Sequence, residues 1–352
     1  MTAPIGLPTV RLSAASLDAW ARRCLVALDV PAADAQCLAG ALVQTSLWGI
    51  DSHGIARLTH YLDRLARGSI RARPEIVVTP TGPGTAQVAG GQGLGHVVAE
   101  RANRVAMDLA KVNGIGAVGV SDSSHCGAIG LYTRAAAGEG LIGIAFTHAD
   151  RIAAPHGGHA PFFGTNPVSI AVPRTGAAPV CLDMATTSIP WNRVMNARLD
   201  GRPLPDGVAL DGEGRPTTDA AAARALRPLG APEHGHKGYA LALMIDLLCG
   251  PLHGNAYGPH IVPMYAALDT PRGLGAFFIV IDPLRFAGGA TLADMAARMA
   301  ADLTAEPGAP HMPGDPEQDA EVERRRDGIP VPAAQLAEMR AWSERLGVEP
   351  PA

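Results

Sequence analysis

The chain has 352 residues, of which 47% are hydrophobic and 18% are charged, and its formal net charge at pH 7 is −4. This length exceeds one typical hydrophobic core, so we expect two lobes, or one large domain with a smaller one attached. The negative charge and the lack of a basic run argue against nucleic acid as a partner, and no apolar stretch approaches the roughly 20 residues that a membrane span needs.

The five cysteines, Cys24, Cys37, Cys126, Cys181 and Cys249, are scattered and form no CxxC pair. This spacing favours free thiols in a reducing cytoplasm over disulfides or a zinc ribbon. The N-terminus lacks a basic segment followed by an apolar run, so no signal peptide is predicted. We therefore expect a cytoplasmic protein.

The first predicted elements are a short strand and two helices. Val10 to Leu12 has the pattern of an edge strand, and residues 17–28 and 32–49 have helical patterns. Ser13 or Ser16 can cap the first helix, because a serine hydroxyl accepts from the free N–H groups at a helix start.

The stretch WGIDSHGIARLTHYLDRLARGSI follows these helices and predicts another one. Ser52 and His53 lie near its start, and Arg57 and Tyr61 come four and eight residues after His53, so His53, Arg57 and Tyr61 would share one helical face. The guanidinium fork of Arg57 suits a carboxylate. The alternative is a solvated basic face with a capping serine.

Residues 76–80 and 85–89 predict a β-hairpin, and the sequence GGQGLG then leads into a helix over residues 96–112. The glycine spacing is GxGxG and not the GxGxxG of dinucleotide-binding turns. This spacing favours a turn that lets the backbone pack closely onto the helix start over a phosphate cradle.

His125 follows a predicted buried strand, residues 115–120, and precedes a helix that begins near Leu131. Loops at strand ends carry the chemistry of open α/β sheets, and histidine titrates nearest neutral pH. His125, between Ser124 and Cys126, is therefore a candidate for proton transfer. The alternative is a histidine that is merely solvated or satisfied within the core.

The remaining elements alternate between strands and helices. Strands are expected at 141–147, 168–172, 180–183 and 276–281, and helices at 240–249, 292–303 and 333–346, with a polar, proline-rich stretch at 305–321. Lys237 would lie at the start of a helix, where a cation does not complement the helix dipole. That placement suggests a ligand-facing lysine, with a solvent-exposed one as the alternative.

A zinc site built on His148, His156 and His159 is one further possibility. No HExxH motif and no further ligand or acidic partner accompany these histidines at a useful spacing. A glycine-rich loop therefore explains the His156-Gly-Gly-His159 sequence better, and no metal is expected.

Several motifs together resemble one known family. In chain order they are DSHGIARLTHYLDRLARGSI, SDSSHCGAIGLYTRAA, GTNPVSIAVP, LDMATTSIPWNRV and GHKGYALALMIDLLCG. The chain resembles the malate/L-lactate dehydrogenase family of the non-Rossmann type. That family includes ureidoglycolate dehydrogenase, sulfolactate dehydrogenase and the piperideine- and pyrroline-2-carboxylate reductases.

The resemblance implies an α/β, non-Rossmann, malate/L-lactate dehydrogenase-like fold with a mixed sheet in the cofactor domain and a second, partly helical domain. It implies a discontinuous substrate-side and dimerisation domain, residues 1–115 plus 300–352, and a nicotinamide-cofactor domain, residues 116–299. It further implies NAD or NADP as the cofactor, a small carboxylate substrate and a homodimer.

The family roles carry over residue by residue. His125 matches the proton donor and acceptor, and Ser52, His53, Arg57 and Tyr61 match the substrate-binding face, with Thr165 in a motif that lines the site. Asp183, Met184 and Ala185 match a cofactor-contacting turn, where Asp183 is also a candidate to orient the catalytic groups. His236, Lys237 and Gly238 match a later cofactor loop, and Arg193 is a candidate to meet a 2′-phosphate or a surface carboxylate.

The implied activity is the reversible reduction of a 2-oxo acid to a 2-hydroxy acid by hydride transfer. The alternatives are an NADPH-dependent reductase of cyclic imino acids, a catalytically silent binding relative and, more distantly, a metal-dependent hydrolase. Two stretches depart from the family pattern. Residues 147–150 weaken the case for cofactor contacts near residue 148, and residues 189–193 argue against malate or lactate as the substrate.

Overall fold

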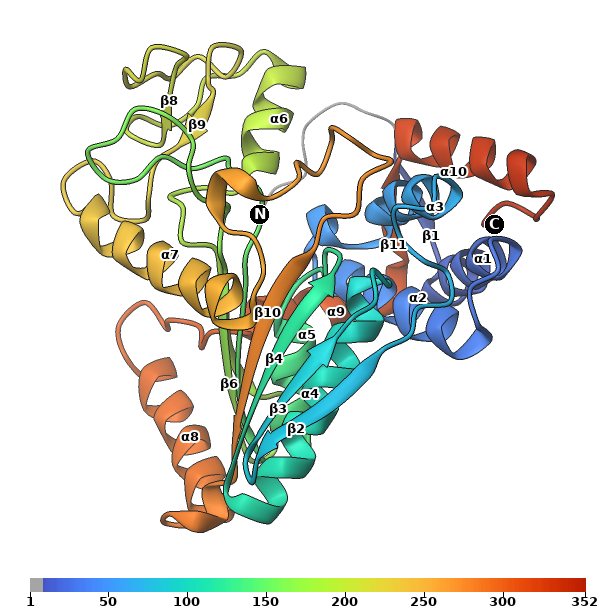
Figure 1. Cartoon of the computed structure of the whole chain (residues 1–352). Coiled ribbons are helices and arrows are strands. Elements are labelled where there is room, and N and C mark those ends of the chain that lie inside the picture. Colours follow the sequence, from blue (N-terminus) through green and yellow to red (C-terminus); the bar gives the residue numbers. More distant parts are fainter. Residues whose placement is uncertain (1–8) are drawn as a thin grey trace.

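The computed structural model describes residues 9–352, and a seven-stranded sheet forms its centre (Figure 1). The strand order is β2 (Val77–Gly82), β3 (Thr85–Ala89), β4 (Ile115–Ser123), β10 (Leu274–Ile281), β5 (Ile142–Thr147), β6 (Val168–Val172) and β7 (Val180–Met184). β3 and β4 pair in parallel, and all other neighbours pair antiparallel. The predicted mixed sheet is therefore confirmed.

Helices cover both faces of this sheet. α4 (Gly95–Asn113) and α5 (Gly130–Gly138) pack on one face, and α7 (Gly235–Cys249) packs on the other. Alternate residues of β10 serve the two layers, since Phe278 joins the cluster under α4 and Phe277 joins the cluster under α7.

The N-terminal helices and the C-terminal helix share a second core. It contains α1 (Ala14–Ala27), α2 (Ala32–Leu47), α3 (Leu58–Ala66) and α10 (Ala333–Leu346). β1 (Thr9–Leu12) pairs antiparallel with β11 (Ile329–Pro332), so these two segments, far apart in the sequence, lie side by side, in blue and red in Figure 1.

A local sequence signal explains the start of α1. Ser13 caps α1 by accepting a hydrogen bond from the N–H of Ser16 at 3.1 Å. The predicted hairpin and the predicted helix over 333–346 are confirmed.

Three further helices and a small ribbon complete the fold: α6 (Trp191–Asp200), α8 (Gly289–Thr304), α9 (Asp315–Asp327), and the pair β8 (Ala209–Leu210) and β9 (Ala225–Leu226). α6 packs with the segment around β8 and β9 over its own small core. α9 lies largely within a stretch that we expected to be only polar and proline-rich. Acidic residues in its first turn and arginines in its last turn complement the helix dipole.

Strands from both expected domains pair in the one seven-stranded sheet. The boundary at residue 115 falls between α4 and β4, which pack against each other, and the boundary at residue 300 falls inside α8. No helix within residues 9–352 is long and apolar enough to cross a membrane.

Candidate active site

His125 and Tyr61 form a hydrogen-bonded pair between the two cores. His125 lies in the loop from β4 to α5, and Tyr61 comes from α3; the Nδ1 atom of His125 is 2.7 Å from the Tyr61 hydroxyl oxygen. Tyr61 is buried, whereas His125 is half-buried. The Nε2 atom of His125 hydrogen-bonds to none of the described residues and is not enclosed. This nitrogen is therefore available to a ligand.

The glycine-rich turn before α4 supports the His125 loop. The N–H of Gly95 donates to the Ser124 hydroxyl at 2.8 Å, and that hydroxyl donates to the carbonyl of Gly93 at 2.9 Å. A Cβ on Gly95 would lie 2.4 Å from the His125 carbonyl oxygen, so only glycine permits this approach. The turn thus packs closely against the His125 loop, whereas the GxGxG spacing predicted close packing onto the helix start.

Ser52 and His53 lie next to the His125–Tyr61 pair. The prediction that His53, Arg57 and Tyr61 share one face of a single α-helix is wrong. Residues 51–53 and 55–57 form two short 3-10 turns, and the α-helix begins only at Leu58. The break falls at Gly54, where a Cβ would lie 2.1 Å from the Ser46 hydroxyl oxygen. The His53 ring nevertheless stacks on His125, with 5.5 Å between ring centroids, and its Nδ1 is 2.9 Å from the Ser52 hydroxyl.

Arg57 places a positive charge beside the histidines. Its Nε donates to the Ser52 carbonyl at 2.5 Å, Nη2 donates to Oδ1 of Asn192 at 3.3 Å, and Nη1 donates to the Tyr265 hydroxyl. No carboxylate of residues 9–352 forms an ion pair with this half-buried guanidinium. Arg57 can therefore attract an anionic ligand.

Two buried arginines that the sequence analysis missed hold the loop carrying Tyr265. Arg272 forms an ion pair with Asp150 and donates to the Val262 carbonyl at 3.0 Å. Arg64, which is 1% exposed, donates to the Met264 carbonyl at 3.0 Å. A buried arginine is unusual unless it is paired in this way, but no local periodicity marks either residue in the sequence.

Burial and positive neighbours favour neutral histidines in this site. Burial lowers the pKa of His125 well below its ordinary value, and the charges of His53, Arg57 and Arg272 lower it further. Burial, followed by the charge of Arg57, lowers the pKa of His53 to about 4. Burial also raises the pKa of the Tyr61 hydroxyl above its ordinary value, so Tyr61 stays protonated.

Asp183, the penultimate residue of β7, lies at the N-terminus of α5. Its Oδ2 accepts a hydrogen bond from the N–H of Gly130 at 2.8 Å. The side chain keeps contact with solvent, yet the protein packed around it raises the pKa of the carboxyl to about 6, against the lowering effect of the Gly130 N–H. No hydrogen bond within the described part of the chain joins Asp183 to His125.

The other expected cofactor-side residues lie in three places: the turn after β7, α6 and the start of α7. Met184 and Ala185 follow Asp183, and the turn they start is tied to Thr165, whose carbonyl accepts from the N–H of Thr186 at 2.9 Å. Arg193 is exposed in α6.

His236 and Lys237 are exposed in the first turn of α7. A Cβ on Gly238 would lie 2.5 Å from the Leu229 nitrogen, so this glycine serves close packing. A cavity of about 200 Å³ adjoins the helix start, with His156 and Arg227 in its lining.

His148 is a structural residue, which accounts for the departure at residues 147–150. Its Nε2 accepts a hydrogen bond from the N–H of Gly275 at 2.9 Å, which leaves the proton on Nδ1 for Asp246, at 3.2 Å. The ring is buried and faces these two partners. Among residues 9–352, no group of three or more His, Cys, Asp or Glu side chains is arranged to hold a metal ion.

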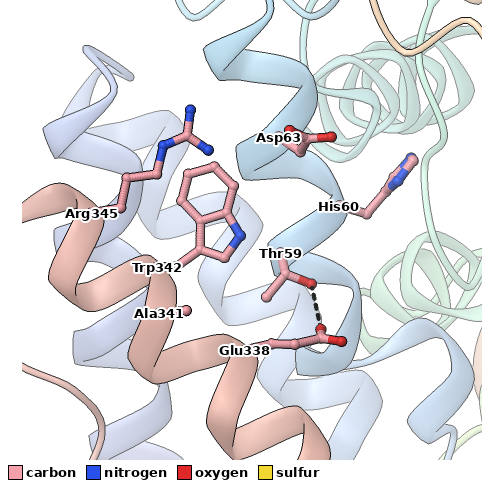
Figure 2. Close-up of a pocket in the computed structure, with 7 residues that line it drawn as sticks. All are labelled: Thr59, His60, Asp63, Glu338, Ala341, Trp342 and Arg345. Carbon is pink, nitrogen blue, oxygen red and sulfur yellow. Dashed lines mark hydrogen bonds between the residues drawn. The ribbon is translucent and has the colours of Figure 1, made fainter.

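A groove of about 440 Å³ between α3 and α10 is separate from this site (Figure 2). Its lining includes Thr59, His60 and Asp63 of α3, and Trp342 and Arg345 of α10. None of the site residues expected from the sequence lines it. We place the candidate active site at His125 because the reactive groups converge there.

A neutral histidine held by a tyrosine, next to an unpaired arginine, equips an enzyme to move a proton on a carboxylate-bearing substrate. Comparison with known sequences shows which family of such enzymes the chain belongs to. Residues 12–340 match the family model described as malate/L-lactate dehydrogenase, and the chain belongs to that family.

Known relatives agree with this placement. Ureidoglycolate dehydrogenase (NAD(+)) of Escherichia coli O157:H7 is 35% identical over 300 residues, which are 84% of each chain. The malate dehydrogenase structure from Entamoeba histolytica has a TM-score of 0.92 at 28% identity, and the match covers 98% of this chain and 100% of that one. The Δ1-piperideine-2-carboxylate reductase structure from Pseudomonas syringae has a TM-score of 0.85 at 28% identity, covering 96% and 99%.

Proposed function

We propose that this protein is an NAD(P)-dependent dehydrogenase that interconverts a small 2-oxo acid and the corresponding 2-hydroxy acid. The observation that carries the proposal is the His125–Tyr61 pair, with Arg57 close by; within residues 9–352, Nε2 of His125 has no hydrogen-bond partner and Arg57 has no carboxylate partner. The family supplies the reaction type, and these residues supply a proton and an anchor for the carboxylate.

Each residue has a distinct task in the proposed reaction. Arg57 binds the carboxylate of the substrate, and His125 gives a proton to the developing alkoxide or takes it from the hydroxyl. When Nε2 exchanges the proton, Nδ1 keeps its own, so the Tyr61 hydroxyl oxygen accepts from Nδ1 and holds the imidazole ring in both protonation states. The carbonyl of Ser52 accepts a hydrogen bond from Arg57. The Ser52 hydroxyl hydrogen-bonds to the ring of His53, which stacks on His125. A bound nicotinamide cofactor supplies or accepts the hydride.

The cofactor-side residues suit a phosphate-bearing dinucleotide. The first turn of α7 offers backbone N–H groups beside Lys237, with His236 and the Arg227-lined cavity adjoining it. Asp183, Met184 and Ala185 lie near the end of the His125 loop, where Asp183 accepts a hydrogen bond from Gly130. We assign the cofactor to the region between the first turn of α7 and residues 183–185. Thr165 supports the turn after β7, and the exposed Arg193 is assigned as a contact for the 2′-phosphate of NADP.

The direct test is the oxidation of NADH and of NADPH with a panel of acids. The panel contains pyruvate, oxaloacetate, sulfopyruvate, a branched 2-oxo acid, and piperideine- and pyrroline-2-carboxylate. Turnover of an open-chain oxo acid would support the proposal. Turnover of the cyclic imines alone would favour the imino-acid reductase, and failure of every substrate would favour a silent relative.

The pH dependence of hydroxy-acid oxidation should follow the low pKa of His125. Neutral His125 accepts the proton, and its pKa lies below the ordinary value of 6.5. We therefore expect kcat/KM not to fall through this ionisation until the pH drops below about 6.5. A pH–rate profile measures this directly. An acidic limb centred above 6.5, and lost in a His125 variant, would contradict the assigned electrostatics.

We further propose a cytoplasmic homodimer. The five cysteines are free thiols, which a reducing compartment preserves. Met244 and Leu247 on the outer face of α7 are 53% and 44% exposed, and Leu252 just beyond is 57% exposed. These residues lie outside the stretches 1–115 and 300–352 to which the resemblance assigns dimerisation. Such a patch suits burial against a second copy.

Light scattering should give twice the mass of one chain if this proposal holds. The double variant Met244→Glu and Leu247→Glu should shift the protein toward monomer, because it would place charges in the apolar contact. Val322→Glu, at a residue of α9 that is 61% exposed, is the matched control. A monomeric wild-type protein would refute the dimer.

A further inference from the structure

Asn192 and Tyr265 hold Arg57 from two segments that are distant in the sequence. Oδ1 of Asn192, in the first turn of α6, accepts from Nη2 of Arg57 at 3.3 Å. The hydroxyl of Tyr265, in the loop before β10, accepts from Nη1. The carbonyl of Ser52 accepts from Nε at 2.5 Å. These contacts orient the guanidinium before a ligand arrives.

The same contacts leave hydrogen-bond donors available around Arg57. A guanidinium has five N–H groups, and the contacts above use three of the donors. Asn192 uses its acceptor on Arg57, and its amide N–H₂ donates to no group in the described chain. Tyr265 accepts from Arg57 and keeps its own hydroxyl proton to donate. Such a group of donors matches the oxygens of an anion.

The positions of these residues place the donors where a substrate can reach them. Arg57 and Asn192 are half-buried, and Tyr265 is 62% exposed, so solvent reaches all three residues. Arg57 acts electrostatically on both His125 and Tyr61, which puts its charge near the reacting groups. Asn192 also belongs to residues 189–193, the stretch that departs from the family pattern.

We propose that Asn192 and Tyr265 bind the substrate's carboxylate together with Arg57 and thereby select an acid over its neutral amide. A carboxylate offers only acceptors to this cluster, whereas a carboxamide presents an N–H₂ group that opposes the donors. The inference rests on the proposed function, because it assigns the carboxylate of that substrate.

The test compares the oxo acid of the panel that is turned over fastest with its 1-carboxamide. Asn192→Ala and Tyr265→Phe should each lower kcat/KM for the acid about 10-fold, mainly through KM, because each removes a hydrogen bond to a charged group. The weak kcat/KM for the amide should stay within about twofold, so the preference for the acid falls. Asn196→Ala, one turn later in α6, and Tyr257→Phe, at another exposed tyrosine before β10, are matched controls.

The possible outcomes separate this inference from the proposed function. An unchanged acid-to-amide ratio in both variants, or equal losses for acid and amide, would overturn the roles of Asn192 and Tyr265 while the dehydrogenase stands. If only cyclic imines are turned over, the comparison is made between the cyclic imino acid and its own carboxamide. If nothing is turned over, the proposed function fails and this inference fails with it.

Discussion

His125→Ala should lower kcat by about 10²- to 10⁴-fold, the usual contribution of a positioned general acid or base. Nε2 of His125 is the free nitrogen of the pair with Tyr61, and alanine leaves no group to exchange the proton. Binding of NAD(P)H should change little, because the residues assigned to the cofactor lie at β7, α6 and α7. Steady-state kinetics and cofactor fluorescence titration measure the two effects separately.

The exposed His311 gives a matched control, since His311→Ala makes the same change at a histidine outside the proposed site and should leave kcat unaltered. Tyr61→Phe keeps the ring but removes the hydroxyl bonded to His125, so its loss should be smaller. Near-normal turnover of an oxo acid by His125→Ala would refute the role of His125. A cyclic imine would depend on His125 less, because its basic nitrogen can bind already protonated.

The parts of this site that could be predicted are the local ones. His125 follows an apolar strand and precedes a helix, and this pattern is visible within about a dozen residues. The spacing of the glycines before α4 predicted a closely packed turn, but not that this turn contacts the His125 loop. Arg57 and Tyr61 were candidates from their spacing after His53, and the family resemblance then assigned them to the substrate-binding face.

The missing parts depend on long-range contacts. Arg57 meets Asn192 and Tyr265 across sequence separations of 135 and 208 residues, and no local period encodes such meetings. The helix α9 was missed for a similar reason: it is too polar to show an apolar face, but Glu321 accepts from the Trp48 indole N–H at 2.9 Å, and Arg324 pairs with Asp51. Tertiary contacts therefore supply what its sequence pattern lacks.

Arg57→Met should raise KM for the oxo acid by roughly 10- to 150-fold, which corresponds to about 1.5–3 kcal/mol for a hydrogen-bonded charge. Methionine preserves much of the side-chain length while removing the cation, so kcat should fall less than it does in His125→Ala. Arg57→Lys should recover only part of the binding, because an ammonium group lacks the planar fork that matches a carboxylate. Initial-rate kinetics over a wide range of acid concentration separate KM from kcat.

The same substitution should also move the pH profile, which distinguishes a lost anchor from general damage. The charge of Arg57 lowers the pKa of His125, so its removal should raise that pKa toward the ordinary value of 6.5. Neutral His125 accepts the proton during oxidation, and the acidic limb of kcat/KM should therefore move to higher pH in Arg57→Met. Arg193→Met removes an exposed arginine of α6 and should leave the limb in place. A raised KM with an unmoved limb would mean that Arg57 binds the acid without tuning His125, whereas an unchanged KM would remove Arg57 from the substrate site.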